Sequence, residues 1–124
     1  MLAPSIEVQD LQRGRNLIAD GNNWCRGTRH SGNKHCALGA LETVFKIDDI
    51  YAAKHDLHQS HVLALLGDVA HEFIRGTNFD FVADYRGTKQ AKDMSAIAIV
   101  NDGLGHIATL NMFDHAIRRA MQPA

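Results

Sequence analysis

The chain has 124 residues, a length that fits one domain and can bury a sizeable apolar core without disulfide bonds. Hydrophobic residues make up 45% and charged residues 22%, which is a globular rather than a disordered balance. The net charge of −1 gives no reason to expect nucleic acid, and no apolar run approaches the ~20 residues of a membrane span. The N-terminus lacks the pattern of a secretory signal, so we expect a cytoplasmic protein whose two cysteines are free thiols.

The first part of the chain predicts two helices separated by a polar loop. Ser5 is a suitable N-cap for a helix over 5–20, and Gly21 follows as a stop signal. Residues 21–33 are rich in Gly, Asn, Ser and Arg and predict an ordered loop. The next helix, over 34–46, is apolar around most of its circumference, so we expect it to be central and buried.

The middle of the chain predicts two more helices. Asp48 and Asp49 are expected to cap a short helix that extends to Leu57. Ser60 is expected to cap a longer helix over 61–75, whose apolar residues follow a 3.6-residue period.

The last third is less uniform. Alternating apolar residues over 79–85 predict a strand, whereas 96–100 fit either a short helix or a strand paired with 79–85. A final amphipathic helix is expected over 107–121. The predicted fold is therefore all-α or mainly α, a small single domain around a central buried helix, with room for one short β-hairpin from 79–85 and 96–100.

Metal and nucleotide motifs are weak in this sequence. Cys25, His30, His35 and Cys36 suggest zinc ligands, but adjacent helical residues point ~100° apart and rarely share one ion. The glycines of the 21–33 loop do not complete a phosphate-binding loop, because the motif's Lys-Ser/Thr pair and its preceding strand are missing. We therefore predict no metal and no cofactor.

Another reading of the loop is an anion-binding face, which the residues favour slightly less than a purely structural role. Arg26, Arg29 and Lys34 precede or begin the central helix, whose N-terminus carries a partial positive charge, and Trp24 supplies a flat apolar face. The alternative is that Trp24 packs in the core and the basic side chains are only solvated.

A cysteine-dependent enzyme is the second reading. Cys36 is placed in the first turn of the central helix, where the helix dipole lowers a thiol pKa. His106 and Asp102 could then serve as a base and its orienting partner. We nevertheless expect Cys36 to be buried and slow to react, so the enzyme question stays open and leans toward no.

The turn at 101–102 is expected to support the long loop. Short amides and carboxylates bond backbone N–H groups readily, and the 22–33 loop has few apolar residues of its own. We therefore predict that Asn101 or Asp102 contacts the 24–36 segment, and that the two segments form one face of the molecule.

Four motifs carry a resemblance to a known family. They are WCRG at 24–27, CALGAL at 36–41, VNDGLGH at 100–106 and FDHAI at 113–117. In this order they resemble the small bacterial and phage proteins of domain-of-unknown-function family 6197, over roughly residues 11–120. The family has no established activity, so the resemblance implies no mechanism. It does imply that Trp24, Cys25, Gly27, Cys36, Asn101 and Asp102 belong to one constellation.

The leading functional hypothesis is a small intracellular binding or accessory module. Its functional face would consist of the 22–36 loop and the 101–106 turn, and its partner would be an anionic small molecule or another protein. The predicted ligand-binding residues are Trp24, Cys25, Arg26, Arg29, Lys34, Asn101 and Asp102. A cysteine-dependent enzyme is the alternative, a purely structural protein comes third, and self-association is left open.

Overall fold

The computed structural model describes residues 5–81 and 86–122, which form a mainly α-helical domain with one two-stranded hairpin. The elements, in chain order, are α1 (Ile6–Leu17), a 3₁₀ turn η1 (Gly21–Asn23), β1 (His30–Ser31), β2 (Lys34–His35), α2 (Ala37–Phe45), α3 (Leu57–Ile74), α4 (Lys89–Ile99), a π-helical turn η3 (Val100–Leu104) and α5 (His106–Met121). This confirms the predicted fold class. None of the helices in the described ranges is long and apolar enough to cross a membrane.

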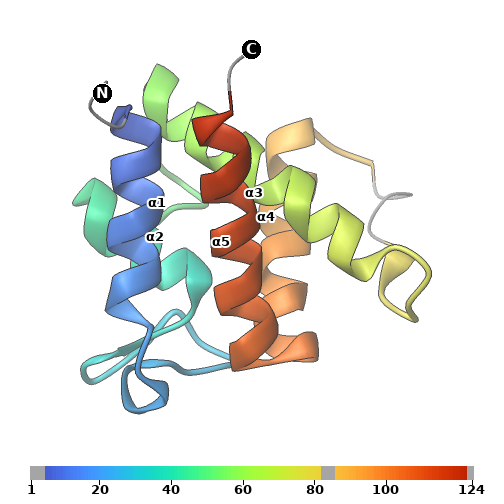
Figure 1. Ribbon diagram of the computed structural model, residues 1–124, viewed down its shortest axis with the longest axis horizontal. Helices are drawn as coiled ribbons and strands as arrows, with labels where there is room; N and C mark the ends of the chain where they lie inside the picture. The colour runs from blue at the N-terminus through green and yellow to red at the C-terminus, as the bar shows by residue number, and fades with distance from the viewer. Residues whose placement is uncertain (1–4, 82–85, 123–124) are drawn as a thin grey trace.

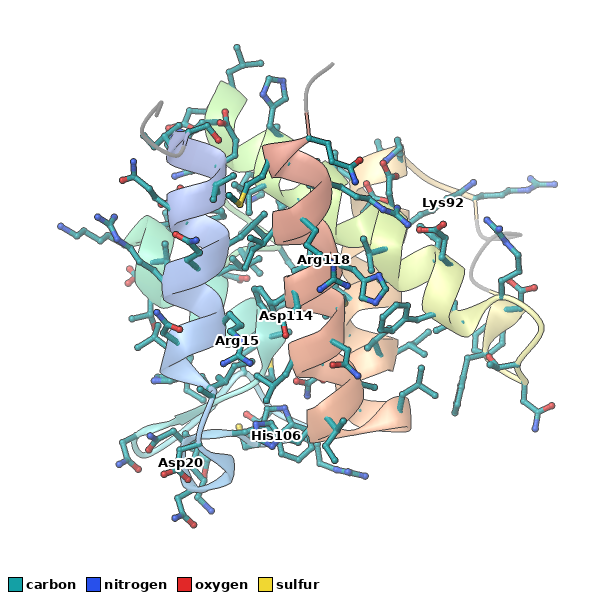
Figure 2. The ribbon with its side chains drawn as sticks, in the orientation of Figure 1. Arg15, Asp20, Lys92, His106, Asp114 and Arg118 are labelled. Atoms are coloured by element: carbon teal, nitrogen blue, oxygen red, sulfur yellow. The ribbon has the colours of Figure 1, made fainter. Side chains whose placement is uncertain are left out.

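Helix α2 is buried along most of its length, and the helices that pack on it most closely are α1 and α4. Helix α1 packs on α2 and α5, while α3 packs mainly on α4 and α5. Arg15 of α1 and Asp114 of α5 point toward each other (Figure 2) and form an ion pair with 3.0 Å between Nε and Oδ1. The prediction that α2 is buried is confirmed, but α3 and α5 pack mainly on other helices and do not enclose it.

The loop between α1 and α2 lies at one end of the bundle. Figure 1 shows this loop beside the junction of α4 and α5, at the end opposite the beginning of α1 and the end of α5. In Figure 2, Asp20 in the loop and His106 at the start of α5 both lie at this end. Two segments far apart in sequence are thus brought together.

Local caps explain most helix boundaries. The hydroxyl of Ser5 accepts a hydrogen bond from the Val8 amide, as predicted. Helix α3 starts earlier than predicted, because Asp56 and Gln59 form a reciprocal capping box. Ser60 is therefore inside the helix and does not cap it.

Two predicted helices and the position of the hairpin differ from the structure. The helix predicted over 34–46 starts only at Ala37, because Lys34 and His35 form a strand. Residues 48–53 form bends and turns where a short helix was expected. The hairpin is formed by 30–35, and its two strands are joined by a turn through Gly32, whose φ is +63°.

Residues 96–100 are helical, so the alternative of a strand there, paired with 79–85, is wrong and the helix alternative is confirmed. Residues 79–81 belong to a turn that continues from α3, and 82–85 lie outside the described residues. Residues 96–100 are the end of α4 and the first residue of the π turn. Ala96, Ile97 and Val100 are buried in the helical core, so their apolar character reflects helix packing and not strand pairing.

Candidate functional site

The α4–α5 junction places two polar side chains against the loop. Helix α4 widens into the π turn η3, which ends at Gly105 with a φ of +96°. Such π turns bulge out of a regular helix and are frequent at functional sites. Here the turn buries Asn101 and leaves Asp102 exposed beside it.

Asn101 uses all of its hydrogen-bonding capacity to hold the loop. Its Oδ1 accepts bonds from Trp24 Nε1 at 2.7 Å and from the Ala37 amide at 3.0 Å. Its Nδ2 donates to the Cys25 carbonyl at 3.0 Å and to Asp102 Oδ1 at 2.9 Å. One fully buried amide therefore joins the loop, the start of α2 and the π turn.

Asp102 holds the next residues of the loop. Its Oδ1 accepts a hydrogen bond from the Gly27 amide at 3.0 Å, and Gly27 has a φ of +79° that disfavours a side chain. Its other oxygen, Oδ2, makes no hydrogen bond to the described residues. The predicted contact between the 101–102 turn and the 24–36 segment is thus confirmed at both positions.

The start of α2 differs from the prediction. Cys36 is the N-cap of the helix, and its Sγ accepts a hydrogen bond from the Gly39 amide at 3.3 Å. Because Asn101 occupies the Ala37 amide, the chain's own side chains already bond two of the N–H groups at the start of α2. This arrangement leaves less of the helix N-terminus for an anion than the sequence suggested.

The thiol of Cys36 is only 7% exposed, as expected. Burial raises its pKa, and hydrogen bonds from the Gly39 and Leu38 amides oppose the increase. The dipole-activated thiol that the enzyme alternative requires is therefore not found.

The His106 side chain contacts the backbone at the end of α1 and not Cys36 or Asp102. Its Nε2 contacts the Ile18 carbonyl at 2.6 Å, and its ring lies 5.1 Å from that of Trp24. The proposed Cys36–His106–Asp102 grouping thus lacks its central hydrogen bond, since neither the thiol nor the carboxylate bonds to this imidazole. His106 instead fixes the loop on α5.

The remaining predicted residues are spread over the loop. Arg26 places its guanidinium carbon 5.2 Å from the centre of the Trp24 ring. Lys34 is exposed on β2. Cys25 is half-buried, with its pKa raised by burial against the opposing charge of Lys34. Trp24 therefore packs against the core and also offers its ring to the guanidinium of Arg26.

Arg29 has partners that the sequence reasoning missed. Its Nη1 bonds to Glu42 Oε2 at 2.9 Å and to Asp49 Oδ1 at 2.5 Å, and its guanidinium carbon lies 5.4 Å from the ring centre of Tyr51. The hydrogen bond to Asp49 is the main reason why the pKa of Arg29 is raised. The sequence feature that could have indicated these partners is Glu42, a carboxylate in a mostly apolar helix, because a buried carboxylate needs partners.

These groups surround a pocket of about 270 Å³. It is lined by Gly27, Thr28, Arg29, Cys36, Leu38, Tyr51, Ala98 and Asp102. Three of the residues predicted from sequence line it: Arg29 and Asp102 among the binding residues, and Cys36 from the enzyme alternative. Trp24, Cys25 and Asn101 support its wall, while Arg26 and Lys34 are not among the lining residues.

The sequence predicts no metal site. Within 5–81 and 86–122, no group of three or more His, Cys, Asp and Glu side chains is placed to hold an ion. Cys36 points its sulfur at the Gly39 amide, away from such a role.

Comparisons with known proteins add no relative. No family model, no curated protein and no solved structure matches this chain. The functional argument therefore depends on the geometry of the site.

Proposed function

We propose that the protein is a binding module that holds a small polar molecule in the pocket between the 27–29 loop, Tyr51 and the 101–102 turn. The observation that carries the proposal is the preformed wall of this pocket. A buried asparagine with every hydrogen bond satisfied holds it, so little ordering cost remains for a ligand.

The chemistry of the pocket suggests the class of ligand. Among the described residues, Arg29 makes its hydrogen bonds through Nη1 alone, which leaves its other N–H groups available to an acceptor. Asp102 offers Oδ2 to a donor, and Leu38 and Ala98 provide apolar contact. A ligand with both an acceptor and a donor, such as an amino acid or an amide, fits this set.

A purely anionic ligand is favoured less than the sequence suggested. Glu42 and Asp49 already balance the charge of Arg29, and the carboxylate of Asp102 faces the same space. A free anion would meet that carboxylate without a compensating cation beside it.

The experiment is an NMR screen of small polar compounds, with backbone amide shifts mapped on the chain. We expect hits to shift the amides of 27–29 and Asp102. Tyr51→Ala should weaken binding roughly tenfold without changing the melting temperature, since Tyr51 is half exposed and stacks on the pocket arginine.

Ile107→Ala is the matched control, because this side chain is exposed on α5 and is not a lining residue. It should bind like the unmodified protein. Hits that shift only other regions, or that bind equally to the Tyr51 variant, would contradict the proposal.

A further inference from the structure

Two histidines face each other across the hairpin. His30 and His35 are direct partners in the register of β1 and β2. Their Nδ1 atoms are 2.8 Å apart, and their rings are nearly perpendicular, with centroids separated by 5.0 Å. The tight turn between the strands fixes their backbones, so the two nitrogens are brought together by the fold and not by side-chain flexibility alone.

A buried carboxylate orients the first of these rings. His30 Nε2 lies 2.7 Å from Glu42 Oε1, and the Glu42 side chain is only 2% exposed. The other carboxylate oxygen of Glu42 accepts bonds from Arg29 and from the Ile50 amide, so the carboxylate is fixed in place. It therefore holds the His30 proton on Nε2 and leaves a lone pair on Nδ1.

The second ring is free to adopt the complementary tautomer. His35 Nε2 has no hydrogen-bond partner among the described residues, so the proton of a neutral His35 can reside there. In the metal-free chain one of the two Nδ1 atoms carries the proton of the hydrogen bond between the rings. When the His35 proton resides on Nε2 instead, the lone pairs of both Nδ1 atoms are available to one ion.

We propose that His30 and His35 form a chelating site for a divalent late transition-metal ion, with Glu42 as the residue that orients His30. Carboxylate–histidine–metal arrangements of this kind set the tautomer and the direction of a ligand ring. The site differs from the small-molecule pocket, because neither histidine lines that pocket, but the two are neighbours through Glu42, which also bonds the pocket residue Arg29.

The separation of the nitrogens indicates the geometry. With metal–nitrogen bonds of about 2.0–2.1 Å, two ligands at right angles are about 2.9 Å apart, whereas tetrahedral ligands are about 3.3 Å apart. The observed 2.8 Å is the length of a hydrogen bond between the rings, and it lies close to the separation that right-angled ligands need, so an ion could replace the shared proton with little movement of the rings. Square-planar or octahedral Cu²⁺ and Ni²⁺ fit this better than tetrahedral Zn²⁺, with water at the remaining positions because both rings are partly exposed.

The test is a titration of the untagged, reduced protein with Ni²⁺ alone, followed by calorimetry and by the imidazole signals in NMR. We expect one site, with the His30 and His35 rings broadened first. His35→Gln should weaken it roughly tenfold or more, since one of two ligands is lost. This variant leaves the His30–Glu42 contact in place, so its melting temperature should be unchanged.

His61→Gln is the matched control, because His61 is an exposed histidine on α3 with one acidic neighbour. It should retain the full affinity. If His35→Gln binds Ni²⁺ as tightly as the unmodified protein, or if His61→Gln shows the larger loss, the facing rings are only a hydrogen-bonded pair and the proposal is wrong.

Discussion

Replacing Asn101 by alanine tests how the loop is held. The change removes four hydrogen bonds and leaves the Trp24 indole N–H, the Ala37 amide and the Cys25 carbonyl without these partners. A hydrogen bond contributes a net ~1 kcal/mol, and a buried group left unpaired costs about 1–3 kcal/mol. Because water can reach the half-buried loop, we expect a total loss of about 2–4 kcal/mol.

Such a loss is measurable in a domain whose unfolding free energy is typically about 5–15 kcal/mol. Urea unfolding can be followed by fluorescence, since Trp24 is the single tryptophan and lies at the affected contact. Asn111→Ala is the control, because Asn111 is an exposed residue of α5 and should change stability by less than about 0.5 kcal/mol. A loss below about 1 kcal/mol for the Asn101 variant, or one equal to the control, would show that the hydrogen bonds of Asn101 do not hold the loop.

Three further predictions address the packing and titration of other residues. A side chain at Gly39 would lie 2.0 Å from the Arg29 carbonyl oxygen, so Gly39→Ala should destabilise the fold by about 1–3 kcal/mol in urea unfolding despite alanine's better helix propensity; equal stability would contradict this. Iodoacetamide should alkylate half-buried Cys25 before buried Cys36, as read by mass spectrometry, and faster labelling of Cys36 would revive the enzyme hypothesis. Burial raises the pKa of Asp10 in the folded state, against the opposing charges of His58 and Arg13. The stability of the unmodified chain should therefore fall as the pH rises from the unfolded-state pKa of Asp10 through its raised folded-state pKa, and Asp10→Asn should gain stability relative to it over that window; a difference independent of pH would argue against this.

The helices with a strong apolar period can be predicted from the sequence, because the burial of one helix face requires apolar residues at a regular local spacing. Ser5 caps α1 as expected, and α5 begins within one residue of its predicted start. The start of α3 was missed because Asp56 and Gln59 cap it reciprocally, a pattern that competes with the plausible cap at Ser60.

The hairpin was misplaced for a physical reason. Lys34 and His35 were assigned to the helix because the apolar pattern begins nearby, but their pairing with His30 and Ser31 depends on contacts across a turn. Residues 96–100 alternate like a strand, yet helical neighbours bury them on several sides. Neither the pairing across the turn nor the packing of neighbouring helices can be read from the local apolar pattern.

The link between the loop and the 101–102 turn was predictable because polar loops need partners for their backbone groups. The contribution of Glu42 and Tyr51 was not, since their roles depend on how the 47–53 turns return the chain to Arg29. The sequence therefore indicates that the two segments meet, but not which residues complete the pocket beside them.

The central claim is that the loop and the 101–102 turn form one preorganised face. Hydrogen exchange of the Trp24 indole N–H and the Gly27 amide, measured by NMR, tests it most directly, because both donate to side chains of that turn. We expect slow exchange of both protons in the unmodified protein, with marked acceleration at the Trp24 indole in Asn101→Ala. Rapid exchange of both protons in the unmodified protein would contradict it.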